Sequence, residues 1–248
     1  MLMNAPRFFC ELPMLEGQTV ALPQTVSHHI RVRRLKAGQQ VVLFDGQGQQ
    51  FESTLQFSPD GQALAEITSS NFADRELKGR IVLVQGIASQ DRMDWVTEKA
   101  VELGVAELIP VAASRSVVKL AGERATKRTE HWRKLIISAS EQCGRNQLMQ
   151  VQPPCDLRQA IRACQNLPKL LCHFSDDHVA LTDPELLSTI KTAGAVCIVV
   201  GPEGGWDANE VRCWLDAGAM ITSLGPRVLR TETAGAAATA ALTALLSW

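Results

Sequence analysis

The sequence predicts an α/β protein with a mainly parallel sheet, preceded by a small β-rich domain. Up to about residue 70, short alternating apolar segments are separated by turns that contain Gly and Pro. From residue 80 onward, apolar strands alternate with helical patterns, which is typical of a parallel sheet covered by helices. The polar segment 74–79 separates the two patterns. We therefore expect a first domain over residues 1–74 and a second over 75–248.

Length and composition favour a soluble intracellular protein. With 248 residues, the chain suits one or two domains of ~150 residues. Its 46% apolar and 21% charged residues are ordinary values, and no apolar run is long enough to span a membrane. The opening residues 1–13 lack the pattern of a signal peptide. The seven cysteines never form a CxxC pair, so we expect no disulfide framework, no metal site and a cytoplasmic location.

The first domain is expected to be a sheet. Residues 40–44 and 51–57 read as strands joined by the turn Asp45–Gly48, and residues 63–68 read as another strand after the turn 59–61. Small sheets of this size usually close into a compact barrel.

Five strands are expected in the second domain, at residues 81–84, 107–111, 170–174, 197–200 and 220–224. The helix after the first strand has Met93, Val96, Ala100 and Leu103 at helical spacing, and Gly104 ends it.

Four further helices complete the predicted pattern. The first has the apolar face Trp132, Leu135, Ile136, Ala139 and Cys143. The next begins at Asp183–Glu185, with Pro at its first position, and ends at Gly194. Asp207 and Glu210 resemble a capping box for a helix that Gly218 ends. The alanine-rich stretch 232–246 is a strong helix former.

Two glycine-bearing loops follow predicted strands, at 201–207 (GPEGGWD) and 225–233 (GPRVLRTET). Neither is a Walker A loop or a GxGxxG fingerprint. In a parallel sheet, ligands bind beyond the carboxyl ends of the strands, so these loops indicate a ligand site, although tight turns alone would also need glycines. Thr231 or Thr233 could cap the next helix and Glu232 suits its dipole, whereas Arg230 has no such local role.

Cationic residues gather in two places despite a net charge of −1. Residues 31–36 hold four cations and no anion. Residues 115–134 hold seven cations against two anions: Arg115, Lys119, Arg124, Lys127, Arg128, Arg133 and Lys134. Such clusters can bind nucleic acid phosphates, but for either cluster alone a solvated face is the commoner explanation.

Two long motifs, IVVGPEGGWDANEV and LGPRVLRTETAGAAATAAL, occur together with EKAVELGV at 98–105, SEQCGR at 140–145 and HHIRVRRLKAG at 28–38. With these motifs the chain resembles the RsmE family, which are SPOUT-class 16S rRNA (uracil-N3) methyltransferases. The resemblance covers essentially the whole chain. Two positions depart from the family pattern: Trp206 stands where Phe is commoner, and Cys143 where Ser is commoner.

The resemblance implies a PUA-like RNA-binding first domain and a second domain with a deep trefoil knot. It also implies a homodimer that acts on 16S rRNA, within the small ribosomal subunit, with S-adenosyl-L-methionine as cofactor and no metal. The cofactor pocket that it implies comprises Leu171, Cys172, His173, Val200, Gly201, Glu203, Gly204, Gly205, Leu224, Gly225, Val228, Leu229 and Arg230.

The reaction class suggests roles for charged residues. N3 of uracil carries a proton near neutral pH, so a carboxylate can act as base while an arginine stabilises developing charge. We expect Glu232 to be the base, and Arg230 and Arg145 to stabilise charge or position a phosphate. Backbone contacts with rRNA are expected from a set of cations in the first domain: Arg7, Arg31, Arg33, Arg34 and Lys36.

The sequence leaves three alternatives open. The chain could be a non-catalytic RNA-binding protein of the same fold. It could be an enzyme that uses another nucleotide, such as a dehydrogenase, although the GxGxxG fingerprint is missing. A SPOUT methyltransferase could also act on another base or on a ribose.

Overall fold

The computed structural model of the protein describes residues 5–116 and 122–248. The chain forms two compact units, and each has its own apolar core. The first unit contains Met1–Glu76 and Ile137–Leu148, and the second contains Leu77–Ile136 and Met149–Trp248. A segment distant in the sequence therefore joins the small amino-terminal unit.

The first unit is built on a five-stranded sheet with the order β1-β3-β4-β5-β2. β1 runs parallel to β3, and the other neighbours are antiparallel. The strands are β1 (Arg7–Phe9), β2 (Thr19–Ala21), β3 (Gln40–Phe44), β4 (Gln49–Phe57) and β5 (Ala63–Phe72). The strands predicted at 40–44, 51–57 and 63–68 are confirmed, and β5 extends further than its apolar pattern.

Helix α1 (Gln24–Val32) covers this sheet and was not predicted. Its residues Val26 and Ile30 are buried in the core beside sheet residues such as Phe8 and Leu55. Only two buried apolar positions mark this nine-residue helix, and its other face is polar. Arg31 in the last turn of the helix, and Arg33 and Arg34 directly after it, are exposed.

The second unit is built on a seven-stranded, fully parallel sheet with the order β10-β12-β9-β11-β6-β7-β8. The strands are β6 (Arg80–Gly86), β7 (Glu107–Val111), β8 (Gln150–Val151), β9 (Lys169–Cys172), β10 (Val179–Ala180), β11 (Ala195–Val200) and β12 (Ala219–Ser223). All five predicted strands are present. β8 and β10 have two residues each, which is too short for a periodic pattern.

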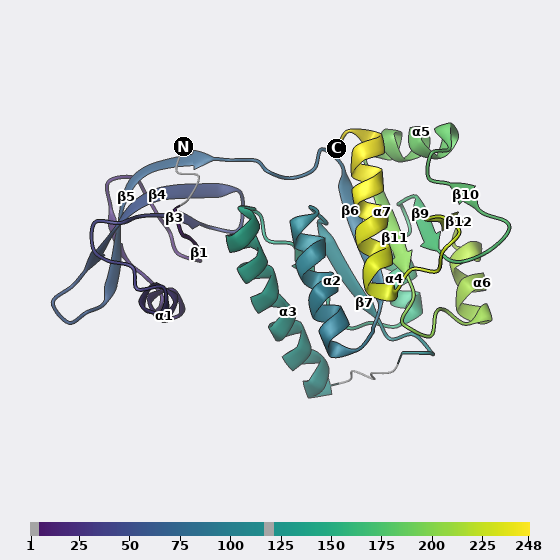
Figure 1. Ribbon diagram of the computed structural model, residues 1–248, viewed down its shortest axis with the longest axis horizontal. Helices are drawn as coiled ribbons and strands as arrows, with labels where there is room; N and C mark the ends of the chain where they lie inside the picture. Colours follow the sequence, from purple (N-terminus) through teal and green to yellow (C-terminus); the bar gives the residue numbers. More distant parts are fainter. Residues whose placement is uncertain (1–4, 117–121) are drawn as a thin grey trace. The chain divides into compact units, whose positions relative to one another are not determined.

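Helices cover both faces of this sheet. They are α2 (Gln90–Glu102), α3 (Gly122–Cys143), α4 (Leu157–Ala163), α5 (Pro184–Ala193), α6 (Ala208–Asp216) and α7 (Thr231–Leu246). α2 and α7 lie side by side, and α7 packs on β6 and β11 (Figure 1). On the face of the sheet opposite α7, Ala160 of α4 and Trp214 of α6 pack in one apolar core with Val82 of β6 and Val199 of β11.

The ends of several helices follow the predicted signals. Asp183 and Asp207 cap α5 and α6, and the reciprocal bonds of the Asp207–Glu210 capping box are present. Gly104 and Gly218 have φ of 82° and 80°, which is the left-handed conformation that glycine adopts at helix ends. α4 was not predicted, although Asp156 and Gln159 form a second capping box.

Within the part of the chain that the structure describes, no helix is long and apolar enough to cross a membrane.

Candidate active site

Three neighbouring strands of the second unit end at the same edge of the sheet. β11 pairs with β9, and β9 pairs with β12, all in parallel register. The loops that follow them, residues 173–178, 201–207 and 224–230, therefore leave the sheet at its carboxyl edge. This is the place where open α/β sheets bind ligands.

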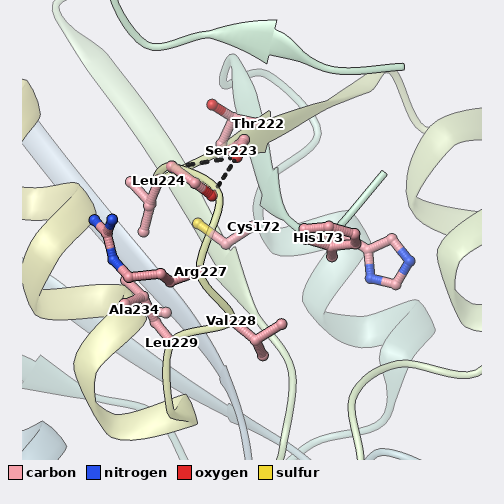
Figure 2. A pocket seen from close by; sticks show the side chains of 11 residues that line it. Cys172, His173, Thr222, Ser223, Leu224, Arg227, Val228, Leu229 and Ala234 are labelled. Atoms are coloured by element: carbon pink, nitrogen blue, oxygen red, sulfur yellow. Dashed lines mark hydrogen bonds between the residues drawn. The ribbon is translucent and has the colours of Figure 1, made fainter. Parts of the chain in front are cut away.

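A cavity of about 100 Å³ opens between the loops after β9 and β12. Its lining comes from these two loops, the ends of the strands and the first turns of α7: Cys172, His173, Phe174, Thr222, Ser223, Leu224, Gly225, Arg227, Val228, Leu229 and Ala234. Figure 2 shows Leu224, Val228 and Leu229 around the cavity and the His173 ring directed away from Leu224 and Arg227. The walls are thus mainly apolar, with hydroxyl groups from Thr222 and Ser223.

Six of the thirteen residues predicted to bind the cofactor line this cavity: Cys172, His173, Leu224, Gly225, Val228 and Leu229. Leu171 and Val200 are buried in their strands. Gly201, Glu203, Gly204, Gly205 and Arg230 do not belong to the lining. The predicted cofactor residues that line the cavity therefore lie at the end of β9, directly after it, and in the loop after β12. The predicted residues in the loop after β11 make other contacts.

The loop after β11 is anchored through a buried polar group. Gln85, at the end of β6, donates from Nε2 to the Gly201 carbonyl at 3.3 Å and to Thr231 Oγ1 at 2.8 Å. Thr231 Oγ1 in turn donates to the Gly201 carbonyl. Because Thr231 begins α7, this network joins the Gly201 loop to the start of that helix. Sequence reasoning assigned no role to Gln85.

Glu203 in this loop is directed toward helix α2. Its Oε1 accepts the backbone N–H of Ser89, the residue that caps α2, at 2.8 Å and lies 3.3 Å from Arg92 Nη1. Partial burial acts to raise the pKa of Glu203, but the Ser89 hydrogen bond and the Arg92 charge outweigh it and hold that pKa below its ordinary value. Glu203 is therefore an ionised group at the start of a helix.

The segment after β7 also contacts this loop and helix α6, which follows the loop. Arg115 donates to the Gly204 carbonyl at 3.1 Å, and the Ser114 N–H donates to Glu210 Oε1 at 2.8 Å. Gly204 has no room for a side chain, because an added Cβ would lie 2.9 Å from Arg115 Cβ. Lys119, which the sequence placed in the same basic cluster, lies outside the described residues.

Glu232 lies in the first turn of α7, near the cavity residue Ala234. Its side chain is 16% exposed, and its Oε2 is buried without a hydrogen-bond partner among the residues that the structure describes. Arg92 Nε is 3.7 Å from Oε2, and Arg230 Nη1 is 4.0 Å from Oε1. The structure thus brings the predicted pair Arg230 and Glu232 together and adds Arg92, which sequence reasoning missed.

Cys172 is the thiol of the cavity. Burial raises the pKa of Cys172 to about 12. The side chain therefore stays a neutral thiol at physiological pH and contributes an apolar surface rather than a nucleophile.

Arg145, the other predicted catalytic cation, lies in the first unit. Its side chain is 5% exposed, and its Nε donates to both carboxylate oxygens of Glu76, at 2.9 and 3.0 Å. Such a buried ion pair stabilises local structure only while both partners are present. The contact gives Arg145 a local structural partner, and its role in the reaction stays a prediction.

The cations predicted to bind RNA differ in their surroundings. Arg31, Arg34 and Lys36 are exposed, and the guanidinium of Arg33 lies over the Phe8 ring at 5.6 Å. Arg7 is half-buried: its guanidinium donates to Gln50 and Asn146 and lies 5.2 Å from the Phe44 ring. The exposed cations therefore lie in the last turn of α1 and directly after it.

Among residues 5–116 and 122–248, no group of three or more His, Cys, Asp or Glu side chains could hold a metal ion.

Two family models match the chain. An RNA methyltransferase domain matches residues 75–243, and an RNA methyltransferase PUA domain matches residues 22–68. The predicted order of a PUA-like domain before a methyltransferase domain is thereby confirmed.

Individual proteins match over nearly the full length. A ribosomal RNA small subunit methyltransferase E from Neisseria gonorrhoeae, solved bound to S-adenosyl methionine, is 38% identical with a TM-score of 0.90, and the match covers 98% of each chain. A methyltransferase from Legionella pneumophila, solved with the cofactor SAM, is 32% identical with a TM-score of 0.88 and the same coverage. A ribosomal RNA small subunit methyltransferase E from Bacillus subtilis is 29% identical over 92% of both chains. With these similarities and the domain match over residues 75–243, the chain belongs to the ribosomal RNA small subunit methyltransferase E family.

Proposed function

We propose that this protein methylates N3 of one uridine in 16S ribosomal RNA, with S-adenosyl-L-methionine as methyl donor. The observation that supports it most directly is the carboxylate of Glu232. It is largely buried, has an oxygen without a hydrogen-bond donor among the described residues, and lies two residues before a cavity residue on the same helix turn. A reaction that must remove a proton needs such an acceptor.

The cavity offers the proposed donor an apolar surface, formed mainly by Leu224, Val228 and Leu229. The Thr222 and Ser223 hydroxyls beside it donate to the Val179 and Gly225 carbonyls. Gly225 contributes only backbone there, with φ of 109°, a conformation that side-chain-bearing residues rarely adopt. When bound, the donor supplies a methyl group on a positively charged sulfur, and no metal is required for that chemistry.

The residues of this chain then have distinct tasks. Glu232 accepts the N3 proton as the new N–CH₃ bond forms and the S–CH₃ bond breaks. Arg230, which is 78% exposed, stabilises negative charge that develops on the uracil carbonyl oxygens. The target base must leave its stack to reach the site. The exposed cations Arg31, Arg33, Arg34 and Lys36 hold the rRNA backbone, and the half-buried Arg7 contributes to the same contacts.

The biological setting belongs to the same proposal. The substrate is rRNA within the small ribosomal subunit, the enzyme works in the cytoplasm, and it acts as a homodimer. Light scattering tests the dimer, for which we expect twice the 27.0 kDa mass of the chain.

The test compares Glu232→Gln with Glu185→Gln. Both glutamates lie in the first turn of a helix of the second unit, which makes Glu185 on α5 a matched control. We expect Glu232→Gln to abolish turnover with cofactor affinity retained, and Glu185→Gln to behave like the wild type. Near-normal turnover of Glu232→Gln would remove it from the mechanism.

Mass spectrometry of 16S rRNA from cells with and without the protein identifies the product. We expect the loss of one 3-methyluridine. Loss of a different methylated base, or of a ribose methyl group, would contradict the proposed acceptor atom while leaving the donor unchanged.

A further inference from the structure

Four charged side chains meet where three segments of the second unit converge, and we call them the Arg92 cluster: Arg92, Glu203, Arg230 and Glu232. Arg92 belongs to the first turn of α2, Glu203 to the loop after β11, and Arg230 and Glu232 to the start of α7. Arg92 lies between the carboxylates, 3.3 Å from Glu203 Oε1 and 3.7 Å from Glu232 Oε2.

The two carboxylates use Arg92 differently. Glu203 Oε1 accepts the Ser89 N–H as well as pairing with Arg92, while Oε2 of Glu203, like Oε2 of Glu232, is buried without a hydrogen-bond partner among the described residues. Glu232 Oε2 is too far from Arg92 Nε for a hydrogen bond, yet the separation is well within the range of Coulomb attraction. The Arg92 guanidinium therefore attracts the Glu232 carboxylate, while Glu232 Oε2 has no hydrogen-bond donor among the described residues and is available to accept a proton.

The contact between Glu203 and Arg92 restricts where the Arg92 guanidinium can lie. By holding the Arg92 guanidinium at its Nη1, Glu203 keeps that group from closing on Glu232, where a bidentate pair would occupy the carboxylate oxygens. Removing Arg92 would instead leave the Glu232 carboxylate without the ion-pair partner at its Oε2. Both changes would impair a base at position 232.

We propose that Arg92 is the positioning residue for the methyl transfer, and that Glu203 acts by setting the place of Arg92 rather than by binding the cofactor. Arg92 orients the Glu232 carboxylate through the 3.7 Å ion pair at its Oε2, and Glu203 couples the loop after β11 to this arrangement. The inference rests on the proposed role of Glu232 as base. It reassigns Glu203, whose carboxylate faces α2 and does not line the cavity.

The test uses Arg92→Gln, Arg92→Lys, Glu203→Gln and the double variant Arg92→Gln/Glu203→Gln. Arg80→Gln is the matched control, because Arg80 also forms an Arg–Glu pair, with Glu107, at the start of β6 rather than at its carboxyl end. For each protein, steady-state kinetics on small-subunit rRNA give kcat and KM, calorimetry gives the dissociation constant of S-adenosyl-L-methionine, and thermal unfolding reports whether the variant is folded.

We expect Arg92→Gln to lower kcat by about tenfold or more with little change of KM, which is the pattern of an interaction needed in the transition state. Arg92→Lys should recover part of that loss because it restores the charge. Glu203→Gln should lower kcat as well, and the double variant should be no slower than Arg92→Gln, because residues that act as one unit are not additive. Cofactor affinity should stay within about twofold of wild type in every variant, since none of these residues lines the cavity.

Specific results would overturn the inference. A normal kcat for folded Arg92→Gln, while Glu232→Gln is inactive, would remove Arg92 and leave the proposed base in place. A tenfold weaker cofactor affinity in Glu203→Gln would make Glu203 a binding residue after all, and additive losses in the double variant would separate Glu203 from Arg92. Normal turnover of Glu232→Gln would instead overturn the proposed function itself, together with this inference.

Discussion

At the residue scale, Arg34 is held in a backbone conformation that usually belongs to glycine. Its φ is 54°, and around it the N–H of Arg34 donates to Arg31 O and the N–H of Leu35 to Ile30 O, which ends helix α1. Glycine is the common residue at this position of a helix end. An arginine here costs stability because its backbone is strained, but it places a cation in the segment proposed to hold rRNA.

Arg34→Gly should therefore stabilise the protein and lower its affinity for rRNA. We expect the free energy of unfolding to rise by up to about 1 kcal/mol, because the left-handed strain disappears. The slope of the logarithm of the rRNA binding constant against the logarithm of salt concentration should decrease by about 1, as expected when one phosphate contact is lost. Urea unfolding and binding measurements at several salt concentrations check both effects.

Arg31→Gly is the control for that prediction, since Arg31 carries the same charge inside α1. It should weaken RNA binding similarly but lower stability by about 1 kcal/mol, the usual cost of glycine in a helix. A loss of stability in Arg34→Gly comparable to that in Arg31→Gly would contradict the strain argument.

Cys172 should react slowly with alkylating reagents although it lines the cavity. Burial raises the pKa of Cys172 to about 12, so its reactive thiolate is scarce at pH values near 8. Cys143 and Cys213 are exposed and should react first with iodoacetamide, as peptide mass spectrometry would reveal. Modification of Cys172 at the rate of Cys213 would show that the burial responsible for the raised pKa is not maintained in solution.

At the element scale, most of the second unit follows from sequence because its strands are buried on both faces and its helix ends carry strong signals. All six residues of β11 are buried, which yields an unbroken apolar run, and Asp207 with Glu210 marks the start of α6. The missed elements lack such signals. α1 has two buried positions, and the two-residue strands β8 and β10 exist only through their pairing with longer neighbours.

The junction between β6 and the loop after β11 is tighter than any local pattern indicates. A Cβ added at Gly86 would lie 2.5 Å from the backbone nitrogen of Pro202 and 2.9 Å from the carbonyl carbon of Gly201. Gly86→Ala must therefore displace the loop that carries Glu203. We expect a loss of on the order of 1–3 kcal/mol in unfolding free energy, as for other overpacked sites, and reduced turnover.

Gly205→Ala provides the comparison, because it lies in the same loop with φ of 68° and no heavy atom within 4 Å of an added Cβ. Only backbone strain opposes that change, so the loss should be about 1 kcal/mol. Chemical denaturation of the two variants distinguishes close packing from strain. Equal losses would show that the contact with Pro202 is not what requires glycine at position 86.

At the scale of the whole molecule, sequence reasoning is limited by contacts between distant segments. The predicted boundary after residue 74 lies near Glu76, but residues 137–148 also belong to the first unit. Asn146 donates to the Ala73 carbonyl at 3.0 Å, and no local pattern reveals such a return. Arg92 was missed for the same reason, since only the fold brings α2 to the start of α7. The trefoil knot implied by the family resemblance stays a prediction.

The division into two units predicts which strands and helices exchange hydrogen more slowly when the cofactor binds. Every residue of the cavity belongs to the second unit, and the two units have separate apolar cores. A ligand at 100 times its dissociation constant stabilises the unit that binds it by about 2.7 kcal/mol, and slows exchange through its opening about a hundredfold. Hydrogen exchange with saturating S-adenosyl-L-methionine should therefore slow in β9, β11, β12 and α7.

The same experiment contains its own comparison, because α3 belongs to both units. Residues 122–136 of this helix lie in the second unit and 137–143 in the first. If the units open independently, exchange in β3, β4 and β5 should be unchanged by the cofactor, and protection within α3 should decrease beyond Ile136. Equal protection of β4 and β11 would mean that the continuous helix makes the two units open together, so that occupancy of the cavity is transmitted to the segment proposed to hold rRNA.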